Sequence, residues 1–146
     1  MNVFSLGCIA ALLWFISSSA GDSVYGKVTT VKSPTQMRFE FDSGFFNIRL
    51  AGIDVPRTIA DSATQFVTRM TLRKNGRIRL EGRVENEVLV RLFMDDSLKG
   101  VREVAVEMLR NGFATRKQNV DFKYGELAAA QREAQVARRG LWSKQN

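Results

Sequence analysis

Histidine is absent from this chain, and cysteine occurs only once, at Cys8. If residues 1–20 are removed as a leader, the remaining part contains neither residue type. A disulfide framework, a zinc site built from cysteine and histidine, a cysteine nucleophile and a Ser-His-Asp triad are therefore excluded from that part. Any metal ion bound there would be a hard cation held by oxygen atoms.

Charge is also absent from residues 1–20, where residues 3–16 form an apolar run interrupted only by Ser5 and Gly7. Small residues ending at Ala20 follow, as they do before a signal-peptide cleavage site. The run is shorter than the ~20 residues that usually cross a bilayer. We therefore expect a signal peptide over 1–20, a secreted or periplasmic protein, and no membrane span after cleavage. An uncleaved N-terminal anchor is the alternative, because no Lys or Arg precedes the run.

The remaining part, residues 21–146, carries the whole net charge of +7. The chain is 45% hydrophobic and contains ten Phe, which is enough for a core, and its length predicts one domain. A basic exported domain is compatible with nucleic acid or an acidic protein surface as a partner. The basic residues are spread along the chain, so a disordered basic tail is not indicated.

Hydrophobic periodicity predicts five strands and three helices. Apolar and polar residues alternate at 36–41 and 46–50 around a turn at Asp42-Ser43-Gly44, which indicates a hairpin with one buried face. The predicted strands are 24–31, 36–41, 46–50, 77–84 and 87–94, and the predicted helices are 61–70, 101–109 and 127–141. The stretch VLVRLFM (88–94) is almost continuously apolar, so we expect that strand to be buried on both faces. Trp142 is expected to close the core.

The order of these elements is three strands, a helix, two strands and two helices. A helix inserted between the third and fourth of five strands is the plan of an OB barrel. The fold class expected is therefore α+β, mainly β, with a five-stranded barrel and three helices.

Three sequence motifs fit this plan: IRLAGIDVPR at 48–57, MLRNGFA at 108–114 and AQREAQVARRGLWS at 130–143. Together, in this order, they resemble the thermonuclease (staphylococcal nuclease-like) family over residues 24–143. The resemblance implies an OB fold and a calcium-dependent phosphodiesterase acting on single-stranded DNA or RNA. It also implies two Asp ligands and a carbonyl for the cation, a glutamate as general base, and two arginines that bind the phosphate.

Only part of that implied set is present here. Arg49 matches the first arginine, and Asp54 matches one cation ligand, followed by the Val55 carbonyl. Arg57 stands where the family has its glutamate, and residues 33–36 contain no carboxylate. Aligning the fifth strand puts Glu87 at the second arginine. Shifting the alignment by four residues would put Arg91 there instead, at the cost of placing Asp95 and Asp96 inside a buried strand.

These replacements predict a site without nuclease chemistry, because losing one such group commonly lowers the rate ~10²–10⁴-fold. We expect Arg57 and Glu87 to form an ion pair across the former pocket. Arg49 and Asp54 have a purely structural alternative, in which the arginine braces the turn carboxylate. Phe45 is the one ring of its hairpin expected to be exposed and free to stack on a base.

The resulting interpretation is an exported binding module for nucleic acid or a protein, without a cofactor. Its site positions are Arg49, Arg57 and Glu87, its expected binding residues are Arg49, Phe45 and Arg57, and Asp54 is the candidate metal ligand. The alternative is a calcium-dependent nuclease with a rearranged site. Its carboxylates would then come from elsewhere, namely Asp22, Glu85 or Asp121. Tyr124 is the only candidate for the tyrosines that the family carries after its middle helix.

Overall fold

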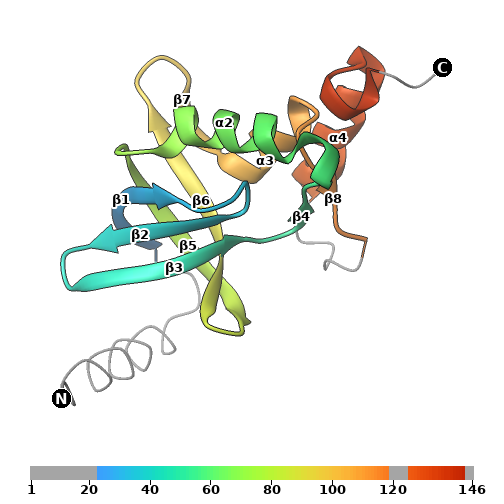
Figure 1. Ribbon diagram of the computed structural model, residues 1–146. Coiled ribbons are helices and arrows are strands. Elements are labelled where there is room, and N and C mark those ends of the chain that lie inside the picture. Colours follow the sequence, from blue (N-terminus) through green and yellow to red (C-terminus); the bar gives the residue numbers. More distant parts are fainter. Residues whose placement is uncertain (1–22, 119–124, 144–146) are drawn as a thin grey trace.

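The protein is built around a β-sheet, and the computed structural model describes residues 23–118 and 125–143. Six strands make one sheet in the spatial order β3-β2-β1-β5-β6-β7 (Figure 1). Their bounds are β1 Ser23–Val31, β2 Gln36–Phe41, β3 Gly44–Leu50, β5 Asn75–Val84, β6 Glu87–Asp96 and β7 Gly100–Glu103. Two short strands, β4 Ile53–Asp54 and β8 Thr115–Arg116, pair outside this sheet. All five predicted strands are present.

A parallel pairing between β3 and β6 closes the sheet into a five-stranded barrel. β3 pairs with Val88–Val90 of β6, and β7 pairs antiparallel with Phe93–Asp96 of the same strand. Alternate side chains point into the barrel, where the largest fully buried ones include Phe39, Met37, Ile48, Ile78 and Leu92. The prediction of a five-stranded OB-type barrel with three helices is therefore confirmed.

Three helices cover the barrel: α2 Ala60–Thr71, α3 Val104–Arg110 and α4 Gly125–Ala137. α2 lies across one end of the barrel in Figure 1 and contacts β1 and α3. α3 packs against β6, and α4 packs on α3. Because α3 has neighbours on several sides, six of its seven residues are buried. Two 3-10 turns, η1 Arg57–Ile59 and η3 Gly140–Trp142, flank the helices.

The prediction that the second helix begins at residue 101 is wrong. Residues 100–103 form β7, and Val101 is 56% exposed. The Asp96 carboxylate accepts hydrogen bonds from the backbone N–H groups of Leu98 and Lys99, and Gly100 adopts a φ of 75°. This tight turn sends the chain back along β6, so these residues pair with β6 before α3 begins at Val104.

The other differences between the predicted and the observed helices and strands are smaller. α2 begins one residue before Asp61, which lies in its first turn and is not the N-cap. β6 is buried on one face only: Leu89, Arg91 and Phe93 on its other face are partly exposed. α4 ends at Ala137, and Leu141 and the half-buried Trp142 belong to η3, outside the core. The spacing of apolar residues in the sequence did not distinguish the separate 3-10 turn η3 from a continuation of the helix.

Several predicted features lie outside the described residues. They are the signal peptide over 1–20 and the candidate residues Asp22, Asp121 and Tyr124. Within the described residues, none of the helices is both long and apolar enough to span a membrane.

Candidate functional site

The positions marked by the resemblance lie around the place where β3 runs beside β6. Arg49 is the second-last residue of β3, and Glu87 is the first residue of β6. The parallel register places Arg49 opposite Leu89, two residues after Glu87. Because Ile48 and Val88 point into the barrel, Arg49 and Glu87 point to its outside. Asp54 ends β4, and Arg57 begins η1.

The Glu87 carboxylate is held by Arg49 and Gln36. Arg49 donates to Glu87 Oε1 from Nε at 3.1 Å and from Nη2 at 2.5 Å. Gln36, which pairs with Arg49 in the β2–β3 register, donates from Nε2 to Oε1 at 3.0 Å and to Oε2 at 3.1 Å. The Glu87 and Arg49 side chains are 16% and 30% exposed. The guanidinium that would bind a phosphate is therefore already occupied by an internal carboxylate.

The expected ion pair between Arg57 and Glu87 is wrong. Among the described residues, the ion pair of Glu87 is with Arg49, while Arg57 is exposed in η1. Glu87 and Arg49 meet because β3 and β6 are adjacent strands, which the sequence did not specify. Arg49 does not brace Asp54 either: the ion pair of Asp54 is with Lys117, at 3.7 Å.

The site residues do not fit a calcium ion. The Asp54 side chain is 65% exposed and faces the ammonium group of Lys117. Among residues 23–118 and 125–143, there is no group of three or more His, Cys, Asp or Glu that could hold a metal ion. Calcium takes six to eight oxygen ligands, usually including several carboxylates. A single exposed carboxylate that is paired with a lysine does not provide such a set.

The structure also bears on the choice between Glu87 and Arg91 for the second arginine position. Glu87 contacts Arg49, whereas Arg91 donates to both oxygens of Glu103, at 2.9 and 2.7 Å. The argument against Arg91 was that it would place Asp95 and Asp96 inside a buried strand. This argument does not hold, because both residues do lie in β6, as its last two residues, and neither is buried there. The contact with Arg49 is the better reason to place Glu87 at the family site.

Phe45 is 43% exposed on β3, as the sequence predicted. One face of its ring is covered by Arg38, whose Cζ lies 3.8 Å from the ring centroid. Phe41 and Phe46 stack on each other with centroids 4.8 Å apart, and Phe46 is buried. Of these three rings, Phe45 alone is open to a partner, and it offers a cation as well as an aromatic surface.

Sequence reasoning missed Gln36 and the polar network around α3. Arg102 and Arg110 both bind the buried carboxylate of Glu107, and Arg110 also reaches Glu133 on α4 at 3.0 Å. The i, i+3 spacing of Glu107 and Arg110 was a visible signal for part of this network. The pairing of Gln36 with Arg49 required the register of the β2–β3 hairpin.

The fold and the positions of these residues define a nuclease-type OB barrel. The model of the staphylococcal nuclease homologue family matches residues 47–144, about two-thirds of the chain. The chain therefore belongs to the staphylococcal nuclease homologue family. No curated protein matches it in a sequence comparison.

Proposed function

We propose that this protein is a binding module of the staphylococcal nuclease homologue family that does not cleave phosphodiester bonds. In this proposal it is exported to the periplasm or the medium, and its partner is nucleic acid or an acidic protein surface. The observation that carries the proposal is the occupation of Arg49 by Glu87, at 2.5 Å from Nη2.

The argument rests on what phosphodiester cleavage demands. A nuclease stabilises the negative charge that develops on the phosphoryl oxygens, with free guanidinium groups or a divalent cation. Here Glu87 competes for Arg49 inside the molecule, where no association entropy opposes the contact. A phosphate at Arg49 would have to displace Glu87 and would then lie beside a second anion.

The position of the general base supports the same conclusion. Arg57 is exposed there, and a guanidinium remains protonated throughout the physiological range. It can attract an anion, but it cannot accept a proton from water. Lys117 also places a positive charge 3.7 Å from the Asp54 carboxylate, which opposes the binding of a divalent cation.

The experiment is a digest of single-stranded DNA, RNA and plasmid with excess protein, in calcium and in chelator. We expect identical, uncut substrates in both. Calcium-dependent cleavage would overturn the proposal in favour of a calcium-dependent phosphodiesterase with a rearranged site. Arg49→Gln serves as the control for a contaminating nuclease: cleavage that survives this change does not come from the family site.

A further inference from the structure

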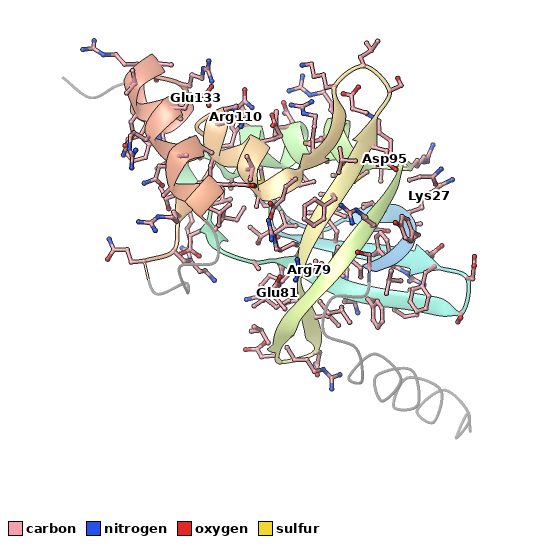
Figure 2. All side chains as sticks on the ribbon, turned by 180° about the vertical axis from the view of Figure 1, so that it is seen from behind. Lys27, Arg79, Glu81, Asp95, Arg110 and Glu133 are labelled. Atoms are coloured by element: carbon pink, nitrogen blue, oxygen red, sulfur yellow. The ribbon has the colours of Figure 1, made fainter. Side chains whose placement is uncertain are left out.

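We infer that the outer face of β1, β5 and β6 binds single-stranded nucleic acid, on residues outside the family site. This face, called the β5 face below, consists of Tyr25, Arg77, Arg79, Arg91 and Phe93. The inference rests on the proposed function and names a partner and a surface for it. Figure 2 looks onto this side of the barrel, with Arg79 on the middle of β5.

The strand register arranges these side chains in rows. Tyr25, Arg77 and Phe93 are direct neighbours across three strands, so a cation lies between two aromatic rings. In the next row, Arg79 lies directly opposite Arg91. The alternate residues of the same strands, among them Ile78 and Leu92, are fully buried, so the rows point outward.

The juxtaposition of Arg79 and Arg91 costs stability unless the charges are matched, because like charges directly across a sheet repel. Arg91 is matched by Glu103 through two hydrogen bonds. Arg79 is exposed and forms no ion pair with any other residue in the described ranges. A bound phosphate would give Arg79 the kind of counter-charge that Glu103 gives Arg91.

The adjacent row offers one exposed ring, that of Tyr25, and a second ring over which two guanidinium groups lie. Tyr25 is 69% exposed, an unusual state for a ring on a barrel strand. The guanidinium of Arg77 lies 4.7 Å from the centroid of Phe93, and that of Arg91 lies 5.2 Å from it. Rings and guanidinium planes both stack on bases without regard to sequence. A hollow of about 560 Å³ adjoins Arg77 and Phe93 and has room for an unstacked base; four cations and three glutamates contribute to its wall.

Spacing and charge favour a nucleic acid strand over an acidic protein. Arg77 and Arg79 are two residues apart on β5, or about 7 Å, a spacing that allows them to contact successive phosphates of an extended strand. Acidic side chains limit the face, with Glu81 at the β-bulge after Leu80 and Asp95 near Lys27 at the other end (Figure 2). A short strand of alternating phosphates and bases matches this alternation of cations and rings.

The test measures fluorescence anisotropy of a labelled single-stranded DNA of about 12 nucleotides, in chelator and at several salt concentrations. The double variant Arg77→Gln/Arg79→Gln should weaken binding about tenfold. The plot of the log of the association constant against the log of the salt concentration should become less steep, its negative slope smaller in magnitude by about 1.4. The matched control is Arg69→Gln with Arg132→Gln, which removes two exposed cations from α2 and α4. It should change affinity less than twofold. Thermal melting checks that both double variants are folded.

Two single variants test the stacking and the limits of the face. Tyr25→Ser should weaken binding about threefold to tenfold, because stacking contributes to each bound base. Glu81→Gln should strengthen binding, whereas Asp42→Asn in the β2–β3 turn should leave it unchanged.

Three results would overturn the inference. They are an absence of binding at low salt, an equal loss in the Arg69/Arg132 control, and loss of binding in Arg49→Gln but not in the Arg77/Arg79 variant. None of these concerns cleavage. Calcium-dependent digestion of the same DNA would instead overturn the proposed function, and the binding measurements in chelator would still decide the role of the β5 face.

Discussion

The Arg49 guanidinium donates two hydrogen bonds to one oxygen of Glu87, from Nε at 3.1 Å and from Nη2 at 2.5 Å. Gln36 donates to both oxygens of the same carboxylate, so three side chains from β2, β3 and β6 form one polar cluster. The cluster joins the two strands whose parallel pairing closes the barrel. Changes at Glu87 should therefore affect stability as well as the family site.

Glu87→Gln should lower the free energy of unfolding by about 1–2 kcal/mol, because a partly buried charge-assisted contact is lost. The value stays below that of a fully buried pair because Arg49 is 30% exposed. Arg49→Gln combined with Glu87→Gln should lose less than the sum of the single changes, with a coupling of about 1 kcal/mol in urea unfolding. Additivity of the two changes would contradict the contact. Arg57→Glu is the control and should stay within about 0.5 kcal/mol, since Arg57 is exposed.

Removing the buried carboxylate of Glu107 should lower the free energy of unfolding more than the change at Glu87 does. It is bound by Arg102 and Arg110 and connects β7 with α3. Glu107→Gln should cost about 2–3 kcal/mol, because two partly buried guanidinium groups lose their counter-charge. Glu133→Gln is the matched control on α4, where the carboxylate is about half exposed, and it should cost less than about 0.5 kcal/mol. Denaturant midpoints measure both changes, and equal costs would refute this role of Glu107.

The turn between β6 and β7 should make stability depend on acid pH. The backbone N–H groups of Leu98 and Lys99 lower the pKa of Asp96 below its ordinary value of 3.8. A lowered folded pKa stabilises the protein above the unfolded value, and this stabilisation is lost as the pH falls through the folded pKa. Wild type should therefore exceed Asp96→Asn in melting temperature at neutral pH, and the gap should narrow as the pH falls below 3.8 and close once the carboxyl is protonated in the folded protein. A gap that is constant with pH would show that the carboxylate charge is not involved.

Calcium at millimolar concentration should not raise the melting temperature. A ligand that binds only the folded state adds ~2.7 kcal/mol at 100 times its dissociation constant. Asp54 is the one family cation ligand present as a side chain, and it faces Lys117 at 3.7 Å. Differential scanning calorimetry with calcium, magnesium and chelator provides the measurement. An increase of several degrees specific to calcium would contradict this prediction and reveal an acidic calcium site in the protein.

Export should yield a mature protein that begins at or near Gly21. The uncharged apolar segment and the small residues before Gly21 predict signal-peptide cleavage. Intact-mass measurement of the periplasmic and extracellular fractions tests this directly. A soluble cytoplasmic form that retains Met1 would contradict it, and a membrane-bound form that retains Met1 would favour the uncleaved anchor.

Local chemistry determined the elements of this fold. The alternation at 36–41 and 46–50 predicted β2 and β3, because a period of two places every apolar side chain on one face. The predicted end of the second helix at residue 109 lies one residue before the observed end of α3 at Arg110, and Gly112 just beyond it has a φ of 76°. The prediction of a helix over residues 101–103 was wrong for a physical reason. Val101 fits a helical period with Val104, but the turn at Asp96 brings this segment against β6 as a strand.

The resemblance also assigned residues to the family site from the sequence: Arg57 at the position of the base, no carboxylate at 33–36, and Glu87 in place of an arginine. That assignment stays a prediction. The pairing of these charges was decided by tertiary structure alone. Glu87 binds Arg49 because β3 and β6 run parallel in one register, and Arg79 faces Arg91 because β5 and β6 pair in another. Such contacts join residues more than ten positions apart, and no local period carries that information. The sequence alone shows which residues are charged. The pairing of strands in the closed barrel determines which of these charges have an internal partner and which are exposed to a ligand.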